Sequence, residues 1–159
     1  METKITKIDA LPKLEKELRV AAYARVSSEK DAMLQSLSNQ VSYYNNLIRL
    51  TEGWSFVGVY ADEALSGTKD TREEFQRLIN DAVEGKIDLI LVKSISRFAR
   101  NTVTMLETVR KLKAIGVDVY FEEQNLHSLS GEGEMVLTFL ASFAQEEARS
   151  VSENQKWKV

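Results

Sequence analysis

The chain has 159 residues, of which 43% are hydrophobic and 28% charged, and its net charge is −3. This length fits one domain with a sizeable core, and the composition is typical of a globular protein. The absence of cysteine excludes disulfides and thiolate metal sites and suits the reducing cytoplasm. No apolar run approaches the roughly 20 residues of a membrane span, and we expect no signal peptide. Because nucleic-acid binders are usually basic, any anion site here must come from local clustering of basic residues.

The first third of the chain begins with a charged stretch and continues with a strand, a helix and a second strand. Residues 1–18 contain Pro12 and show little periodicity, so we expect a flexible leader there. A short apolar run over residues 19–24 predicts the first strand. Apolar residues recur every three or four positions from Met33 to Leu50, which predicts an amphipathic helix. Aromatic and β-branched residues from Trp54 to Ala61 predict the second strand.

The middle of the chain continues this alternation. We expect a polar loop from Asp62 to Thr71 and then a short helix that stops at Gly85. The buried stripe of that helix is predicted to be Phe75, Leu78, Ile79, Ala82 and Val83. The nearly continuous apolar run from Asp88 to Val92 predicts a strand buried on both faces of a parallel sheet.

The last third of the chain adds two helices and one strand. We predict a helix from Thr102 to Ile115, a strand from Val117 to Phe121, and a loop over residues 124–133. A final helix is expected to begin near Glu134 and to bury Val136, Phe139, Leu140, Phe143 and Val151. It reaches the last residue without a glycine or proline, so we expect the chain to end inside a longer helix. The alternation throughout predicts an α/β fold with a mainly parallel central sheet and flanking helices.

Basic residues cluster after two of the predicted strands. Arg25 and Ser27 lie two residues apart on the first strand, so their side chains are expected on the same side. Lys93, Arg97 and Arg100 follow the buried strand, and the carboxyl ends of parallel strands form the edge where open α/β sheets bind ligands. Guanidinium groups around one hydroxyl suit a phosphate and its developing charge. The alternative is that these arginines are solvated surface residues and Ser27 simply begins a loop.

Five motifs, in the right order and with similar spacing, resemble those of serine recombinases, the resolvase and invertase family. They are Tyr23–Ser28, Ser36–Gln40, Asp62–Gly67, Lys93–Arg100 and Ala144–Glu147, and the likeness covers about residues 19–152. The resemblance implies that Ser27 is the nucleophile and that Arg25, Arg97 and Arg100 belong to the active site. It further implies site positions at Tyr23, Gln40, Asp62, Arg72, Ser96 and Glu147.

The resemblance also implies a reaction. The serine attacks a DNA phosphodiester, becomes linked to the 5′ phosphate and releases a 3′ hydroxyl, so one ester replaces another and religation requires no ATP. The implied partners are DNA and further copies of the chain, as a dimer and as a tetramer in the active complex, with no membrane, cofactor or metal. In agreement, the sequence has no Walker-type phosphate loop. Its single histidine, His127, is expected to be a surface residue.

Two departures from the family pattern bear on the domain organisation. The family often has an aspartate where this chain has Ser96, and resolvases carry an arginine where Ala148 stands. These departures favour a large serine recombinase of a mobile element, whose catalytic domain, here residues 19–159, precedes large DNA-binding domains. Two other classes stay open. One is a flavodoxin-like phosphoesterase or nucleotide-binding domain, and the other is a non-enzymatic oligomerisation module built on the last helix.

Overall fold

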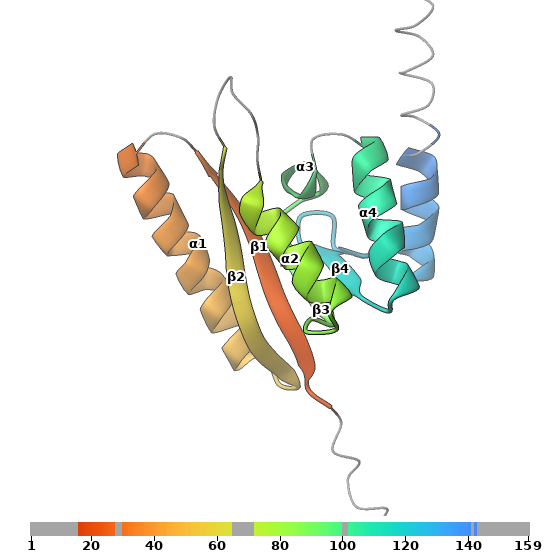
Figure 1. The fold of residues 1–159 in the computed structure, drawn as a ribbon, viewed down its shortest axis with the longest axis horizontal. Coiled ribbons are helices and arrows are strands. Elements are labelled where there is room, and N and C mark those ends of the chain that lie inside the picture. The colour runs from red at the N-terminus through yellow and green to blue at the C-terminus, as the bar shows by residue number, and fades with distance from the viewer. Residues whose placement is uncertain (1–15, 28–29, 65–71, 100–101, 141, 143–159) are drawn as a thin grey trace, which may run out of the picture.

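A single sheet of five strands, in the order β2-β1-β3-β4-β5, forms the centre of the molecule (Figure 1). It is seen in a computed structural model that describes residues 16–27, 30–64, 72–99, 102–140 and 142. The strands are β1 (Leu18–Ser27), β2 (Trp54–Ala64), β3 (Leu89–Val92), β4 (Asp118–Phe121) and β5 (Leu126–His127). The first four are parallel, and the two-residue β5 pairs antiparallel with β4. The predicted α/β fold with a mainly parallel sheet is therefore confirmed.

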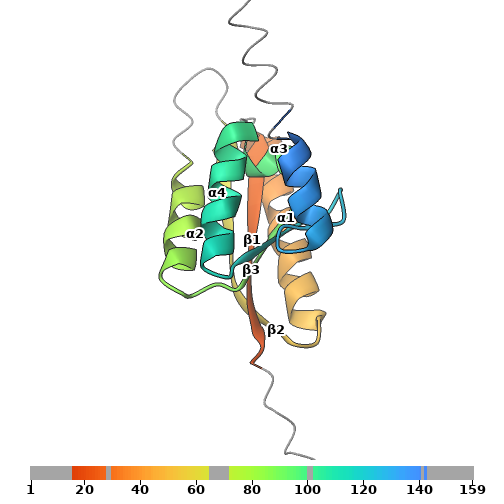
Figure 2. The ribbon, with the colours of Figure 1, turned by 90° about the vertical axis from the view of Figure 1, so that its right-hand side faces the viewer.

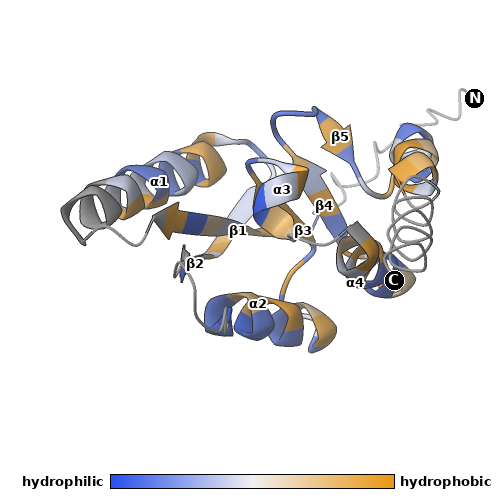
Figure 3. Cartoon of the chain, turned by 90° about the horizontal axis from the view of Figure 1, so that it is seen from above, coloured by the Kyte–Doolittle hydropathy of each residue, from blue (hydrophilic) through white to orange (hydrophobic). Residues whose placement is uncertain are grey.

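Helices cover both faces of the sheet. They are α1 (Lys30–Leu50), α2 (Glu73–Val83), α3 (Ile95–Phe98) and α4 (Thr102–Ala114), and residues 131–140 are helical as well. Figures 2 and 3 show α1 on one face and α2 and α4 on the other. The hydrophobic side of α2 is turned toward the sheet and its hydrophilic side outward (Figure 3). No helix in the described part of the chain is long and apolar enough to cross a membrane.

The alternation of side chains along β1 divides the core into two layers. Val20, Ala22 and Ala24 pack with Tyr44 and Ile48 of α1. Ala21 and Tyr23 point the other way, into the larger cluster that includes α2 and α4. All four residues of β3 are buried, as expected for a strand with helices on both faces.

Several boundaries differ from those predicted. Residues 62–64 continue β2 instead of beginning a loop, and β5 lies inside the predicted loop 124–133. In both places, pairing with a neighbouring strand satisfies the backbone of residues whose polar side chains look like loop. The final helix begins at Gly131, three residues earlier than predicted. Residues 65–71, like the expected leader over residues 1–15, lie outside the described residues.

Two of the predicted core residues are exposed. Val83, the last residue of α2, lies beyond the stripe that faces the sheet and is exposed. Phe139 is 71% exposed, whereas Leu137 of the same helix is buried. The helix turns Leu137 toward the core and leaves Phe139 uncovered by any described residue. Phe143 and Val151 lie outside the described residues. The predicted stop at Gly85 is confirmed, because this glycine has a left-handed backbone (φ 83°) and its N–H donates to the carbonyl of Ala82.

Candidate active site

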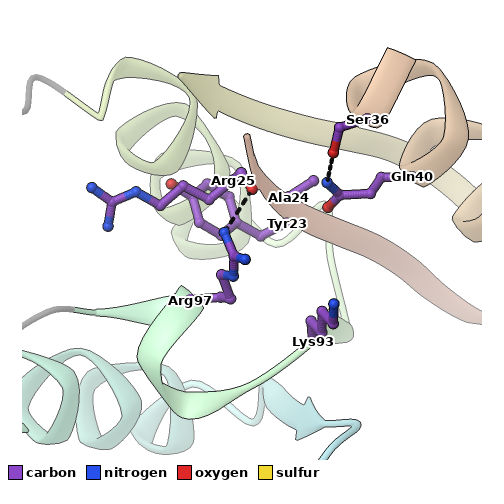
Figure 4. A pocket seen from close by; sticks show the side chains of 7 residues that line it. All are labelled: Tyr23, Ala24, Arg25, Ser36, Gln40, Lys93 and Arg97. Atoms are coloured by element: carbon purple, nitrogen blue, oxygen red, sulfur yellow. Dashed lines mark hydrogen bonds between the residues drawn. The ribbon is translucent and has the colours of Figure 1, made fainter. Parts of the chain in front are cut away.

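The carboxyl edge of the parallel strands holds a cavity of about 220 Å³ (Figure 4). It is lined by Tyr23, Ala24 and Arg25 of β1, Ser36 and Gln40 of α1, Lys93 after β3, and Arg97 of α3. Three of these side chains are cationic, although the chain as a whole is acidic. The ends of β1 and β3 thus meet at one cavity, as the sequence predicts. Its cationic walls suit an anion.

Arg25 is held within the protein and does not extend freely into solvent. It is only 6% exposed, so the alternative that it is a solvated surface residue is wrong. Figure 4 shows its guanidinium extending away from Lys93, while the guanidinium of Arg97 lies between the two. Ser27 ends β1 two residues later, with its backbone paired to Ala64. The position of the Ser27 side chain lies outside what the structure describes.

Arg97 is positioned by a four-residue helix with its own cap. The hydroxyl of Ser94, which is buried, accepts a hydrogen bond from the backbone N–H of Arg97 at 3.3 Å. The other end of the helix is fixed by Phe98, which is fully buried and packs edge-to-face on Phe75 and Phe121. The Arg97 guanidinium then donates to the carbonyl oxygen of Arg25 at 3.1 Å. This bond joins α3 directly to the strand that ends at Ser27.

Arg97 and Arg100 are three residues apart, a spacing that would place them on one face of a continuous helix, but α3 does not provide that face. The helix ends at Phe98, and Ala99 has an extended backbone (φ −152°), so α3 does not continue to the second arginine. Arg100 itself lies outside the described residues. Ser96 is exposed and does not line the cavity, and its hydroxyl lies 3.0 Å from that of Ser94.

Behind the cavity, Asp62 ties β2 to its neighbours. It is 8% exposed, and its carboxylate accepts hydrogen bonds from the Tyr23 hydroxyl at 2.8 Å and from the backbone N–H groups of Glu74 and Phe75, both at 2.9 Å. Asp62 therefore caps the start of α2 while it orients Tyr23. Burial raises the pKa of Tyr23 to about 12, so this phenol is a neutral hydrogen-bond donor at ordinary pH.

Arg72 belongs to the same hydrogen-bond network as Asp62 and Tyr23. Its backbone is left-handed (φ 41°), and its guanidinium stacks on the ring of Phe75 at 3.9 Å from the ring centre. Its Nε lies 3.4 Å from the Tyr23 hydroxyl, and Nη2 donates to the carbonyl of Phe98. Arg72 and Asp62 thus hold β1, α2 and α3 together without lining the cavity themselves.

Residues 20–159 match the family model described as "Resolvase, N terminal domain". The chain belongs to the resolvase family. Transposon Tn3 resolvase of Escherichia coli is 32% identical over 136 residues, which are 86% of this chain and 67% of that protein. A resolvase family site-specific recombinase from Streptococcus pneumoniae is similar in structure, with a TM-score of 0.72 and 27% identity over 87% of this chain and 93% of that one. The N-terminal catalytic domain of TP901-1 integrase has a TM-score of 0.59 and 27% identity, covering 82% and 97%.

This membership confirms the family that the five motifs predict. The chain is a serine recombinase catalytic domain, and its enzyme class is that of site-specific DNA recombinases. The phosphoesterase and the oligomerisation module are not favoured. The similar proteins include resolvases and an integrase, so the expectation of a large serine recombinase stays a prediction.

Of the remaining predicted site positions, the structure places Gln40 but does not describe Glu147. Gln40 lines the cavity and donates to the hydroxyl of Ser36 at 3.1 Å, one helical turn earlier. Glu147 and Ala148 lie outside the described residues. Sequence reasoning missed Ser36 and Ser94 as site residues, although Ser36 stands four residues before Gln40 and Ser94 three before Arg97, which are the spacings of a shared helix face and of a helix cap.

Metal ligands do not gather in the described part of this recombinase domain. No group of three or more histidine, aspartate or glutamate side chains there could hold a metal ion. His127 lies on β5, away from the cavity, where its Nδ1 is 2.6 Å from a carboxylate oxygen of Asp118. It is a half-exposed surface residue, as the sequence predicts.

Proposed function

We propose that this domain cuts and rejoins DNA through Ser27. The Oγ of Ser27 attacks a DNA phosphorus, the bond to the 3′ oxygen breaks, and the strand stays attached as a 5′-phosphoserine ester. The proton lost by the hydroxyl is balanced by the proton that the 3′ oxygen gains. The same exchange in reverse rejoins a strand, so no nucleotide triphosphate is consumed. DNA as the substrate, together with a chain free of cysteine, is consistent with a cytoplasmic protein.

One observation carries the proposal: the strand that ends in Ser27 also supplies a wall of the cationic cavity. Arg97 lines this cavity, and its guanidinium donates to the backbone carbonyl of Arg25, two residues before Ser27. A guanidinium fixed in this way is already in position for the charge that develops on the nonbridging oxygens, so no reorganisation is needed during the reaction. We assign transition-state stabilisation to Arg97 and Arg25, and to Arg100 by the family motif alone.

The other predicted residues receive supporting roles. Gln40 is proposed to contact the bound phosphate, because its amide lines the cavity. Tyr23, Asp62 and Arg72 are proposed to position β1 and α3, because their hydrogen bonds join these elements. Ser96 and Glu147 keep the roles that the motifs suggest, without a described contact to the cavity. No general base is assigned, since the surrounding cations favour an ionised Ser27 hydroxyl.

Association with further copies is part of the proposal. Met135 and Phe139 are four residues apart on the helix over residues 131–140, and both are strongly exposed. Two large apolar side chains on one helix face form a small apolar patch, and apolar patches that extend further mark contacts between proteins. Their exposure supports a contact with a second copy, as expected for a dimer and an active tetramer. The catalytic domain is proposed to cover residues 19–159, with DNA-binding domains beyond it.

The test is covalent capture of DNA by the protein that carries this domain. A duplex with a nick near the cleavage site should trap the protein as an adduct on a 5′ phosphate, which denaturing gels and mass spectrometry detect. Ser27→Ala should form no adduct and should still fold and bind DNA. Ser28→Ala is the matched control and should react normally. If Ser27→Ala still forms an adduct and Ser28→Ala does not, the nucleophile is Ser28.

A further inference from the structure

A second cavity, of about 410 Å³, adjoins the first, and Gln40 and Lys93 line both. Its other walls include Tyr43 and Tyr44 of α1 and Glu122 and Glu123, which directly follow β4. This volume lies within the roughly 300–1,000 Å³ of small-molecule sites. None of the roles assigned above uses these four residues.

The walls of the second cavity combine aromatic faces with carboxylates. Tyr43 is about half exposed, and its ring packs edge-to-face on Tyr44 at 5.1 Å between centres. The Tyr43 hydroxyl donates to Oε2 of Glu122 at 2.8 Å, a bond that joins α1 to the end of β4. The other carboxylate oxygen, Oε1, is buried and accepts no hydrogen bond of normal geometry from the described residues. The Tyr44 hydroxyl is nevertheless close to this carboxylate, since burial first and then Glu122 raise the pKa of Tyr44. An acceptor of this kind favours a ligand that brings an N–H donor.

The two cavities differ in charge. Arg25, Lys93 and Arg97 line the first, whereas two carboxylates oppose the single cation Lys93 in the second. A phosphate group is therefore favoured in the first cavity and disfavoured in the second. A flat group with N–H donors is favoured in the second, because tyrosine rings stack on bases and glutamate accepts from exocyclic amines.

We propose that the second cavity holds an unstacked nucleobase next to the phosphodiester bound in the first cavity. The base preferred there carries an exocyclic amine, which donates to Glu122, and its face lies against Tyr43. The shared walls Gln40 and Lys93 make the two sites adjacent, as the phosphate and base of one nucleotide are. Removing a base from the stack costs least in a nicked or single-stranded region. This inference rests on the proposed function, since it assumes that the first cavity binds a DNA phosphate.

Mononucleotides provide a test that does not require cleavage. The 159-residue chain is titrated with dCMP, dTMP and inorganic phosphate, and binding is followed by NMR shifts of backbone amides. The two pyrimidines have similar size, but only cytosine has the exocyclic amine. We expect dCMP to bind about tenfold more tightly than phosphate, at the low end of what base–aromatic stacking gives. We expect dTMP to lie between them.

Variants separate the two cavities. Glu122→Gln should bring dCMP down to the affinity of dTMP, and Tyr43→Ala should bring both down to that of phosphate. Tyr43→Phe keeps the ring and should retain most of the stacking, which guards against an unfolded alanine variant. Glu107→Gln, an exposed change on α4, is the matched control and should alter nothing. Arg97→Gln should weaken dCMP, dTMP and phosphate by the same factor.

The outcomes distinguish this inference from the proposed function. Equal binding of dCMP, dTMP and phosphate, all weakened by Arg97→Gln, would overturn the base site and leave the phosphate site intact. Failure of all three to bind, together with failure to form a Ser27 adduct, would overturn the proposed function itself. Binding of an arginine-rich peptide that depends on Glu122, without any preference for dCMP, would assign the cavity to a protein partner and would also overturn the base site.

Discussion

The two edges of the parallel strands each hold an arginine and an aspartate, and these two pairs differ in burial. At the carboxyl edge, Arg25 and Asp62 are almost fully buried. The Asp62 carboxylate accepts three hydrogen bonds, and the backbone carbonyl of Arg25 accepts one from the side chain of Arg97, which is itself exposed. At the amino edge, Arg19 and Asp88 form a two-pronged ion pair whose side chains remain 47% and 34% exposed. Burying a charge without partners costs far more than leaving it in water. The carboxyl edge is therefore a site built to hold charge in place, whereas the amino edge is ordinary solvated surface.

Because of this difference in burial, substitutions at the two edges should differ in their energetic cost. In a buried network each removed group leaves its partners unsatisfied, and their lost solvation is not recovered. At an exposed pair, water replaces the lost partner, so the energetic cost is small. The two edges can thus be compared by matched substitutions, and the expected effects range from loss of catalysis to a small change in acid stability.

The largest expected effect comes from Arg97. Arg97→Gln should slow adduct formation by about 10²–10³-fold, the usual cost of losing one preorganised charge donor. Arg97→Lys should recover little, because an ammonium cannot bond the Arg25 carbonyl and the phosphate as a planar fork does. Rates of capture on a nicked duplex measure both. Arg77→Gln, which removes an exposed arginine paired with Glu74 on α2, is the control. A rate for Arg97→Gln within a few-fold of the wild type would contradict the assignment.

Asp62 should produce the largest effect on stability. Asp62→Ala removes the acceptor of one phenol and two backbone N–H groups, and we expect the free energy of unfolding to fall by about 2–4 kcal/mol. Asp88→Ala at the opposite edge should cost several-fold less. Urea denaturation of the two variants gives the comparison directly. Equal losses would show that burial at the carboxyl edge is not what makes its carboxylate important.

Much of the carboxyl edge can be predicted from the sequence, because short runs of neighbouring residues mark each strand and the point where it ends. Apolar runs mark the strands, parallel strands end at one edge, and polar residues follow each run, so Arg25, Lys93 and Arg97 are expected to meet. The burial of β3 on both faces follows from its unbroken apolar run in the same way. Residues 62–64 escape the pattern, because a polar strand end that pairs with a neighbour looks like a loop.

The contacts that complete the site are not local and leave no pattern in the sequence. The Tyr23–Asp62 bond spans 39 residues and the Tyr43–Glu122 bond spans 79, so each depends on how the sheet brings distant segments together. The same holds for Phe139, whose spacing is that of a core residue but whose helix presents it to the surface. Whether an apolar helix residue is covered depends on neighbours that periodicity does not reveal.

The stability that Tyr23 contributes at the carboxyl edge should depend on pH. Tyr23→Phe keeps the ring contact with Phe75 and loses the bond to Asp62 together with the long contact to Arg72, so we expect a loss of about 1 kcal/mol at pH 8. The pKa of Tyr23 is raised to about 12 in the folded protein. A raised pKa means that the stability is fully present below the unfolded value of about 10 and is lost as the pH rises through the folded value. Between pH 10 and 12 the wild type should therefore lose more stability than Tyr23→Phe, as urea titrations at pH 8 and 11 would measure.

The smallest expected effect is at the amino edge. The hydrogen bonds from Arg19 hold the pKa of Asp88 below its usual range. A lowered pKa means that the pair stabilises the fold above the unfolded value of about 3.9 and that this contribution is lost as the pH falls through the folded value. Urea titrations at pH 7 and pH 3 should show a slightly steeper acid loss for the wild type than for Arg19→Gln. Because both side chains remain accessible to solvent, 1 M salt should remove most of that difference, whereas it should leave the Tyr23→Phe difference almost unchanged. A salt-resistant effect of Arg19→Gln as large as that of Tyr23→Phe would mean that the two edges are built alike.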